Sequence, residues 1–153
     1  MSALLQDIPR LRVMRVSDLD AIMEIEPEIY AYPWTRGNFS DSLATGYSCW
    51  VMECGGFLVG YGVLMQGVEE AHLLNISIAK SWQGQGLGRK LLQHFIGVAR
   101  AGKSDFLYLE VRPSNVVALG LYLSAGFQRI AIRRNYYPAF HGREDAILLG
   151  LRL

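Results

Sequence analysis

The segment Gln83-Gly84-Gln85-Gly86-Leu87-Gly88-Arg89-Lys90 lies between an apolar run, Leu73 to Ala79, and an amphipathic pattern that follows it. The run is typical of a strand, and the pattern that begins at about Gly86 is typical of a helix. Glycine tolerates positive φ and lets a ligand approach the backbone closely. A helix start adds unpaired N–H donors and about half a positive charge. The segment therefore predicts a site for a phosphate or pyrophosphate group.

The spacing of these glycines argues against two common nucleotide motifs. The pattern is GxGxG, whereas a Rossmann dinucleotide fingerprint needs GxGxxG and a downstream acidic ribose ligand. A Walker A loop needs serine or threonine after its lysine, and here Leu91 follows Lys90. A Rossmann module is therefore a weak alternative, and a glycine loop that binds nothing also stays open.

The composition is that of one globular domain, expected over residues 1–153. Hydrophobic residues make up 51% of the chain and charged residues 19%. The formal net charge of +1 gives no electrostatic argument for nucleic acid or an anionic membrane as a partner. The first ten residues lack a secretory signal, and no apolar stretch is long enough to span a bilayer. We expect a cytoplasmic protein, with a monomer favoured and the oligomeric state open.

The two cysteines, Cys49 and Cys54, are expected to be reduced core thiols. Their odd separation places them on opposite faces of one strand, which argues against a disulfide. The chain has no CxxC and few histidines, so we expect no metal site.

Along the rest of the chain, strand-like and helix-like patterns alternate. Strands are expected at Leu11 to Val16, Tyr47 to Cys54, Phe57 to Met65, Val68 to Ala79, Asp105 to Arg112, Gln128 to Arg134 and Arg143 to Leu153. Helices are expected from Ser17, as N-cap, to about Tyr30, from Arg36 to Ala44, from Gly86 to Ala101, and from Ser114 or Asn115, as N-cap, to Ala125. Gly55-Gly56 predicts a hairpin, Gly126 a helix end, and Asn135 to Pro138 a tyrosine-rich loop. Early hairpins and later βαβ-like units indicate an α/β (α+β) fold, a mixed sheet with helices on both faces.

Glu110 is a candidate general base because it ends an expected strand on the face that carries Phe106 and Tyr108. A carboxylate beside aromatic surface loses hydration, which predicts a raised pKa and suits proton abstraction. The alternative is an ordinary strand-end glutamate, solvated or paired with Arg112.

Tyr122 and Asn115 belong to the following helix pattern. The Tyr122 hydroxyl is a candidate proton donor to a leaving group, although helical tyrosines are more often core residues. Asn115 is equally well interpreted as a ligand or as an N-cap.

These residues together resemble the GNAT N-acetyltransferases. Gln83-x-x-Gly86-x-Gly88 is similar to the acyl-CoA pyrophosphate loop of that family. Three longer segments, with His141 to Ala146 and Tyr32-Pro33-Trp34, resemble the bacterial branch that acetylates the N-terminal amine of small-subunit ribosomal protein eighteen. Those segments are Leu109 to Asn115, Ala118 to Phe127 and Arg133 to Pro138. The resemblance runs from Leu11 onward, and Pro113 is one departure from it.

The resemblance implies a GNAT-like, mostly antiparallel twisted sheet, acetyl-CoA as co-substrate, and a protein N-terminus as acceptor. It implies that Glu110 is the general base and Tyr122 the general acid. The acetyl-CoA-binding residues it implies are Ile76, Ser77, Ile78, Gly84, Gln85, Gly86, Leu87, Gly88, Arg89 and Asn115. The peptide-binding residues it implies are Trp34, Tyr136 and Tyr137, for which simple packing is an equal alternative. Two other functions stay open: transfer to a lysine side chain or small amine, and non-catalytic acyl-CoA binding.

Overall fold

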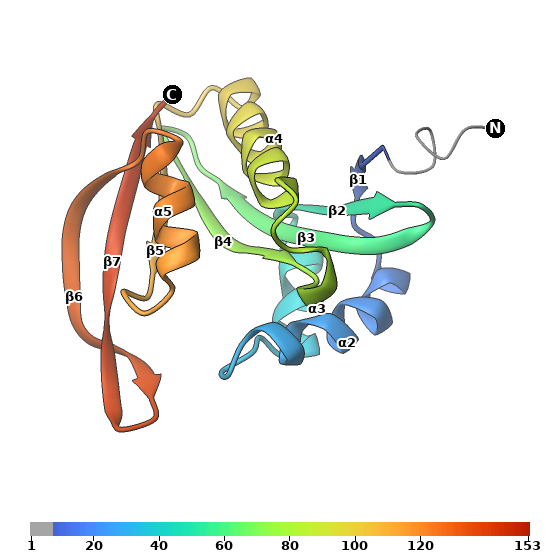
Figure 1. Ribbon diagram of the computed structural model, residues 1–153. Coiled ribbons are helices and arrows are strands. Elements are labelled where there is room, and N and C mark those ends of the chain that lie inside the picture. Colours follow the sequence, from blue (N-terminus) through green and yellow to red (C-terminus); the bar gives the residue numbers. More distant parts are fainter. Residues whose placement is uncertain (1–7) are drawn as a thin grey trace. The chain divides into compact units, whose positions relative to one another are not determined.

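The computed structural model describes residues 8–153, which form a seven-stranded sheet with the order β1-β2-β3-β4-β5-β7-β6 and four α-helices (Figure 1). The strands are β1 (Arg10–Val13), β2 (Ser48–Cys54), β3 (Phe57–Gln66), β4 (Glu70–Ile78), β5 (Phe106–Val111), β6 (Gln128–Ala139) and β7 (Gly142–Arg152). The helices are α2 (Leu19–Ile29), α3 (Arg36–Thr45), α4 (Leu87–Ala101) and α5 (Val116–Ser124), with short 3-10 turns η1 (Val16–Asp18) and η2 (Lys80–Trp82). Strands β4 and β5 pair in parallel and the other recorded pairs are antiparallel, so the predicted mixed, mostly antiparallel sheet is confirmed.

The chain divides into two compact units, each with its own set of contacts. Within the described residues, the first unit comprises 8–65 and 75–95, and the second comprises 66–74 and 96–153. Strands β3 and β4 and helix α4 contribute residues to both units. Among residues 8–153, none of the helices is long and apolar enough to cross a membrane.

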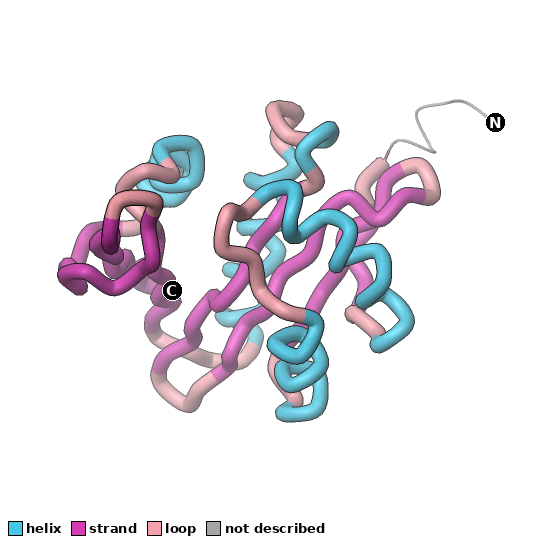
Figure 2. Tube along the Cα trace, turned by 90° about the horizontal axis from the view of Figure 1, so that it is seen from below, coloured by secondary structure: helices cyan, strands magenta, loops and turns pink. Residues whose placement is uncertain are grey.

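Strand β3 explains how the first unit places helices on both faces of its strands, as Figure 2 illustrates. Tyr61 and Val63 join a buried cluster with residues of α2 and α3. The alternate residues Gly60 and Gly62 face α4, because side chains on a strand alternate between faces. A Cβ on Gly62 would lie 2.5 Å from the Phe95 ring and 2.7 Å from a β4 carbonyl. The two glycines therefore let α4 pack directly against the strand.

The hairpin between β2 and β3 turns at Gly55-Gly56, as predicted. Their φ angles are 59° and 83°, and two consecutive positive φ values are typical of a type I′ turn. Cys49 and Cys54 on the preceding strand are both buried. Burial raises the pKa of the Cys49 thiol to about 11, which makes it unreactive at neutral pH.

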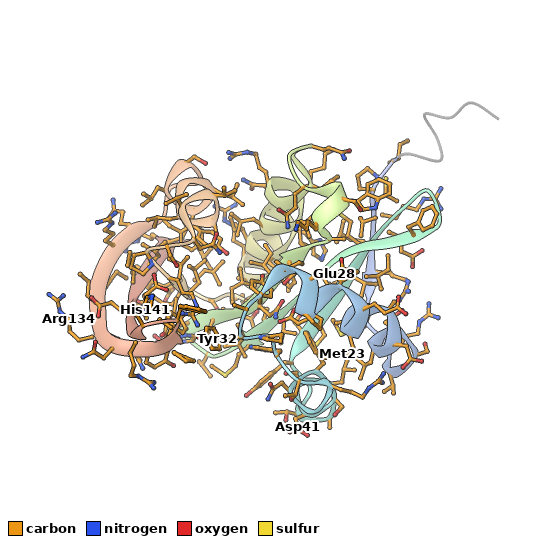
Figure 3. The ribbon with its side chains drawn as sticks, turned by 60° about the horizontal axis from the view of Figure 1, so that its bottom comes forward. Met23, Glu28, Tyr32, Asp41, Arg134 and His141 are labelled. Carbon is orange, nitrogen blue, oxygen red and sulfur yellow. The ribbon has the colours of Figure 1, made fainter. Side chains whose placement is uncertain are left out.

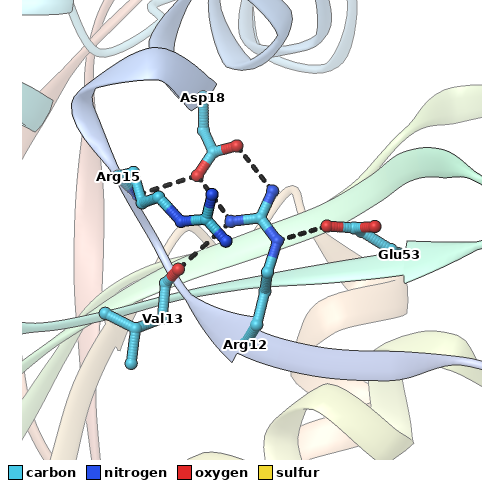
Figure 4. A network of polar contacts seen from close by, with 5 residues as sticks. All are labelled: Arg12, Val13, Arg15, Asp18 and Glu53. Atoms are coloured by element: carbon cyan, nitrogen blue, oxygen red, sulfur yellow. Dashed lines mark hydrogen bonds and ion pairs between the residues drawn. The ribbon is translucent and has the colours of Figure 1, made fainter.

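Ser17 is not the N-cap of α2, and that prediction is wrong. A 3-10 turn precedes the helix, and the Asp18 carboxylate accepts a hydrogen bond from the Arg15 backbone N–H at 2.7 Å. Arg12 donates to both oxygens of the same carboxylate, at 2.8 and 2.7 Å, and also binds Glu53 (Figure 4). An ion pair with Arg12 of β1 thus defines the start of the helix in place of a serine cap.

Replacing Asp18 with asparagine is expected to lower the free energy of unfolding by about 1–3 kcal/mol at pH 7. The hydrogen bonds from Arg12 hold the pKa of Asp18 below its usual range. A carboxylate with a lowered pKa stabilises the fold above its unfolded-state pKa, and that stabilisation is lost as the pH falls through the folded-state value. Urea unfolding at pH 7 and pH 3 should therefore show the difference between wild type and Asp18→Asn shrinking in acid. Asp20→Asn, at an exposed ion pair with Arg36, is the control and should change stability by less than about 1 kcal/mol.

The second unit contains β5, β6 and β7 with α5. Asn115 caps α5, since its side chain accepts from the Ala118 N–H at 3.3 Å. The helix ends at Ser124 with Ala125 as its C-cap, and Gly126 follows with a φ of 105° that suits glycine. The Phe127 N–H returns to the Tyr122 carbonyl at 3.1 Å. Both helix ends are as predicted.

The tyrosine-rich segment is part of strand β6, so its prediction as a loop is wrong. The pairing of β6 with β7 is interrupted after Arg133 and resumes at Tyr137 opposite Glu144. Within the interruption, Asn135 has a φ of 53°, and its N–H donates to Asp145 at 2.9 Å. A bulge therefore carries the irregular sequence without ending the strand.

Candidate active site

The glycine segment forms the connection between β4 and α4. Gly84 and Gly86 have φ angles of 79° and 83°, a region that side-chain-bearing residues rarely adopt. The space beside both is open to 4 Å. The Gln83 side chain donates to the Ile78 carbonyl at 2.9 Å and so fixes the start of the loop to the end of the strand.

This loop fits a phosphate-bearing group. Helix α4 begins at Leu87, which is buried and anchors the first turn, whereas Gln85 and Arg89 are exposed. The N–H groups of the first helical turn have no intrahelical acceptor, and the helix dipole makes this end positive. The backbone from Gly84 to Arg89 therefore offers several donors and open space at one end of a helix.

The end of β4 has one edge already paired. The Ala79 N–H donates to Val59 of β3 at 2.8 Å, so by alternation Ile76 and Ile78 direct their backbone groups to the other edge. The parallel ladder of β4 with β5 covers Glu70 to Leu73, and Ile76 and Ile78 lie beyond it. Ser77 is 3% exposed and its hydroxyl donates to Asn75 at 2.9 Å. The Ile76 and Ile78 carbonyls accept from the Tyr30 hydroxyl and the Gln83 side chain, so the N–H groups of these two residues are the backbone groups suited to pair with an extended ligand.

Glu110 lies on β5, on the same face as Phe106 and Tyr108 as predicted. Its Oε2 atom is buried and has no hydrogen-bond partner, and its Oε1 atom lies 3.9 Å from the Arg133 guanidinium. Arg112 forms an ion pair with Glu144, and the role of Glu110 as a general base stays a prediction. A half-buried carboxylate with one unsatisfied oxygen is able to accept a proton or hold a water molecule.

Tyr122 and Asn115 both lie on α5. Tyr122 is 7% exposed and its ring packs against Phe127, with the ring centres 5.9 Å apart. Asn115 uses its side-chain oxygen as the helix cap, which realises the capping interpretation. The amide nitrogen of Asn115 is not needed for the cap, so a role with a ligand stays a prediction.

An ion pair connects the β5–α5 loop with the β6–β7 hairpin. Glu144 accepts from the Ser114 N–H and the Ser114 hydroxyl, each at 2.9 Å, and from Arg112 at 3.2 Å. Arg112 also donates to the Pro138 carbonyl at 2.7 Å, and its guanidinium lies 4.4 Å from the centre of the Tyr137 ring. These contacts hold the two tyrosines of the hairpin next to the strand that carries Glu110.

For the acetyl transfer to a peptide that the resemblance implies, replacing Glu144 with glutamine is expected to raise the peptide KM several-fold and to lower stability by about 1 kcal/mol. Glutamine keeps only one acceptor oxygen for the donors from Ser114 and Arg112, so the hairpin loses part of its attachment. The affinity for acetyl-CoA should not change. Steady-state kinetics and urea unfolding measure these effects, with the exposed Glu69→Gln as control. A peptide KM equal to that of wild type would mean that this ion pair contributes to stability and not to peptide binding.

Tyr136 and Tyr137 form an aromatic pair with ring centres 5.0 Å apart. Tyr136 is 43% exposed, and the Arg133 guanidinium lies 5.3 Å from its ring centre. Burial and the nearby Glu110 charge raise the pKa of Tyr137 to about 12, so its hydroxyl stays protonated. Arg133 thus lies between Glu110 and Tyr136, whereas Arg134 extends away from β6 (Figure 3).

Trp34 lies in the connection between α2 and α3, close in sequence to the exposed Tyr32 (Figure 3). The Trp34 ring packs on Phe39 with the centres 5.0 Å apart, and the backbone N–H of Trp34 donates to the Glu26 carboxylate at 3.0 Å. Packing accounts for the position of the ring, and a contact with a peptide stays a prediction.

Sequence reasoning missed Glu26. It is 1% exposed and follows Leu19 and Ile22 on the buried face of α2. The signal was present, since a carboxylate at the i, i+3, i+7 positions of an apolar helix face is unusual. The roles of Arg112 and Glu144 depend on contacts distant in sequence, and no local pattern indicates them.

Comparison with known proteins identifies the family of this chain. Residues 19–127 match the acetyltransferase (GNAT) family. The chain is 38% identical to the [ribosomal protein bS18]-alanine N-acetyltransferase of Escherichia coli K12, over 90% of this chain and 93% of that protein. It is also 38% identical to the N-alpha-acetyltransferase RimI of Mycobacterium tuberculosis, over 79% of each chain.

The solved structures agree as well. The crystal structure of the ribosomal-protein-S18-alanine N-acetyltransferase from Escherichia coli superposes with a TM-score of 0.89 and 36% identity, covering 95% of this chain and 94% of that one. The family match covers more than half of the chain, and the fold is the one that the resemblance implied. The chain therefore belongs to the GNAT family of acetyltransferases.

Proposed function

We propose that this protein transfers the acetyl group of acetyl-CoA to the N-terminal α-amine of a protein, and that the acceptor is the N-terminal alanine of ribosomal protein bS18. The observation that carries the proposal is the buried, unpartnered Oε2 atom of Glu110 on β5. The similarity to relatives named for bS18 supports the choice of acceptor. The reaction is expected in the cytoplasm.

The acceptor amine has to be neutral before it attacks a thioester carbonyl, which is the activated group that acetyl-CoA supplies. A peptide α-amine titrates near 7.7–8.0 and a lysine amine near 10.4. The difference of roughly 2.5 pKa units makes a lysine about 3.5 kcal/mol harder to deprotonate near neutral pH. A carboxylate base such as Glu110, acting directly or through one water, is therefore better matched to an α-amine.

The residues of each unit take separate tasks in this proposal. In the first unit, the N–H groups from Gly84 to Arg89 hold the pyrophosphate, and the backbone of Ile76 to Ile78 pairs with the pantetheine arm. A backbone N–H of this strand stabilises the oxyanion that forms on attack. In the second unit, Glu110 removes a proton from the amine and Tyr122 protonates the departing thiolate. No covalent enzyme intermediate is required.

Replacing Tyr122 with phenylalanine is expected to lower kcat by about tenfold or more, which begins below the roughly 10²- to 10⁴-fold range typical of general acid–base catalysis. A thiol has a pKa near 8.5, so its thiolate leaves without much help and the effect should be smaller than that of losing the base. Stopped-flow detection of free CoA measures the rate. A mutant as fast as the parent would assign the proton to solvent.

The proposed function is tested with peptides that copy the N-terminus of bS18. One peptide has a free α-amine, and a second has its α-amine blocked and its lysines free. Mass spectrometry after incubation with acetyl-CoA should show one acetyl group on the first peptide and none on the second. Acetylation of the blocked peptide would mean lysine transfer. Acetylation of neither, with acetyl-CoA still bound, would favour a different acceptor or a non-catalytic acyl-CoA-binding protein.

A further inference from the structure

The first unit contains a buried polar network that the proposed chemistry does not use. Its centre is Glu26 on α2, whose carboxylate is almost fully enclosed. Oε1 accepts from the Tyr61 hydroxyl at 2.6 Å and has a longer contact of 3.5 Å with the Asn75 amide. Oε2 accepts from the backbone N–H of Trp34 at 3.0 Å. The carboxylate therefore touches β3, β4 and the connection between α2 and α3.

The network continues from Asn75 to the backbone of β4. The Ser77 hydroxyl donates to the side-chain oxygen of Asn75 at 2.9 Å and lies 2.8 Å from the Tyr30 hydroxyl. The Tyr30 hydroxyl also lies 2.9 Å from the Ile76 carbonyl, to which it donates. Tyr30 follows α2 directly, so both ends of the network depend on the same helix. Burial raises the pKa of the Tyr30 hydroxyl to about 12, which keeps it a donor.

Glu26 is an unusual choice if stability alone matters. Its recorded partners are neutral donors, and among the ion pairs of residues 8–153 it has no cation. Burial raises the pKa of Glu26, because enclosure disfavours the charged form more than the three hydrogen bonds favour it. Burying a carboxylate without a cation costs several kcal/mol, and a neutral side chain of similar size avoids that cost. An energetically unfavourable group of this kind is typical of functional positions.

The two ends of the network are the segments to which the resemblance assigns binding. Trp34 is a proposed peptide contact, and Ile76 and Ser77 belong to the strand proposed to pair with acetyl-CoA. A carboxylate accepts at both oxygens, so it can hold the N–H of one segment while it fixes the side chains that hold the other.

We propose that Glu26 is a positioning residue for acetyl transfer, which holds the Pro33–Trp34 segment and the Ile76–Ser77 backbone in one hydrogen-bonded arrangement. This inference rests on the proposed function. Glu26 acts through Trp34, Asn75 and Tyr61 and does not itself meet a substrate. Its role is to hold the proposed peptide-binding segment at Trp34 and the proposed acetyl-CoA-binding strand at Ile76 in fixed positions. This matters because small errors in the placement of reactants are costly in catalysis.

The test compares Glu26→Gln and Tyr30→Phe with wild type on the bS18 peptide. Glutamine has the shape of glutamate but only one acceptor oxygen, so it cannot accept from Trp34 and also from Tyr61 and Asn75. We expect kcat/KM to fall about tenfold, with a higher peptide KM and a lower kcat, while the free energy of unfolding stays the same or rises. Tyr30→Phe should lower kcat/KM through the same network. The double mutant should be little worse than the poorer single mutant.

Glu28→Gln is the matched control, since Glu28 is an exposed residue on the same helix (Figure 3). Its kcat/KM should equal that of wild type. Wild-type kinetics in Glu26→Gln would overturn the inference, as would additive effects of Glu26→Gln and Tyr30→Phe. If Glu26→Gln does not fold, Tyr30→Phe still tests the inference. A Tyr30→Phe variant with the same kcat/KM as wild type would overturn it. Failure of the wild-type protein to acetylate the peptide would instead be a failure of the proposed function.

Discussion

Replacing Glu110 with glutamine is expected to lower kcat for α-amine acetylation by about 10²- to 10⁴-fold, the range typical of general acid–base catalysis. Glutamine has nearly the shape of glutamate but cannot take a proton from the amine. The affinity for acetyl-CoA should stay within twofold of wild type, because Glu110 is not among the residues proposed to hold it. Rapid-quench kinetics with the bS18 peptide, together with calorimetric titration of acetyl-CoA, measure both quantities.

The pH dependence of this mutant separates a base from a merely structural carboxylate. Above pH 8 most of the α-amine is already neutral in solution, so less is gained from an enzymatic base. The ratio of wild-type to Glu110→Gln rates should therefore narrow as the pH rises from 7 to 9. Glu70→Gln, at an exposed carboxylate on β4, should keep the wild-type rate throughout. A ratio that does not change with pH would remove Glu110 from the role of base.

Local chemistry explains why some of the fold was predictable. The turn at Gly55-Gly56 and the helix end at Gly126 need positive φ, which only a few residue types adopt readily, so the sequence marks them directly. Asn115 caps α5 with its own side chain, three residues from its partner. Each of these features depends on residues within one turn of the chain.

Contacts between different secondary-structure elements explain what could not be predicted. Ser17 has the composition of a helix cap, but Asp18 is held by Arg12 of β1, and this ion pair displaces the start of α2. Asn135 suggested a loop, but its N–H finds Asp145 on β7, which lets the strand continue through a bulge. In both cases a side chain ten or fewer residues away in the chain, but on another element, determines the outcome.

Some features of the candidate site were predictable from local sequence, and others were not. The glycine loop was recognisable because its closely spaced glycines lie between a strand pattern and a helix pattern. Glu110 was recognisable because strand alternation places it beside aromatic residues. The unsatisfied oxygen of Glu110 and its approach to Arg133 depend on the packing of β5 against other strands. The same is true of Glu26, whose three partners come from residues 8 to 49 positions away in the sequence.

Replacing Gly86 with valine is expected to weaken the binding of acetyl-CoA by about 10- to 100-fold. Gly86 has a φ of 83°, and a β-branched residue in that region costs about 1–3 kcal/mol. The loop therefore has to change its conformation, and the N–H groups around it no longer point at one anion. Since each 1.4 kcal/mol corresponds to a tenfold change in affinity, the expected loss follows from this strain.

A glycine inside the helix that follows the loop provides the control for Gly86→Val. Gly97 lies in the interior of α4 with ordinary helical backbone and open space around it, so Gly97→Ala should raise stability by up to about 1 kcal/mol and leave binding unchanged. Calorimetric titration with acetyl-CoA and with CoA lacking the acetyl group should show the same loss for Gly86→Val, because the loop is proposed to hold the pyrophosphate that both share. A loss restricted to acetyl-CoA would place the loop at the acetyl group instead, and unchanged affinity for both would exclude it from the binding site.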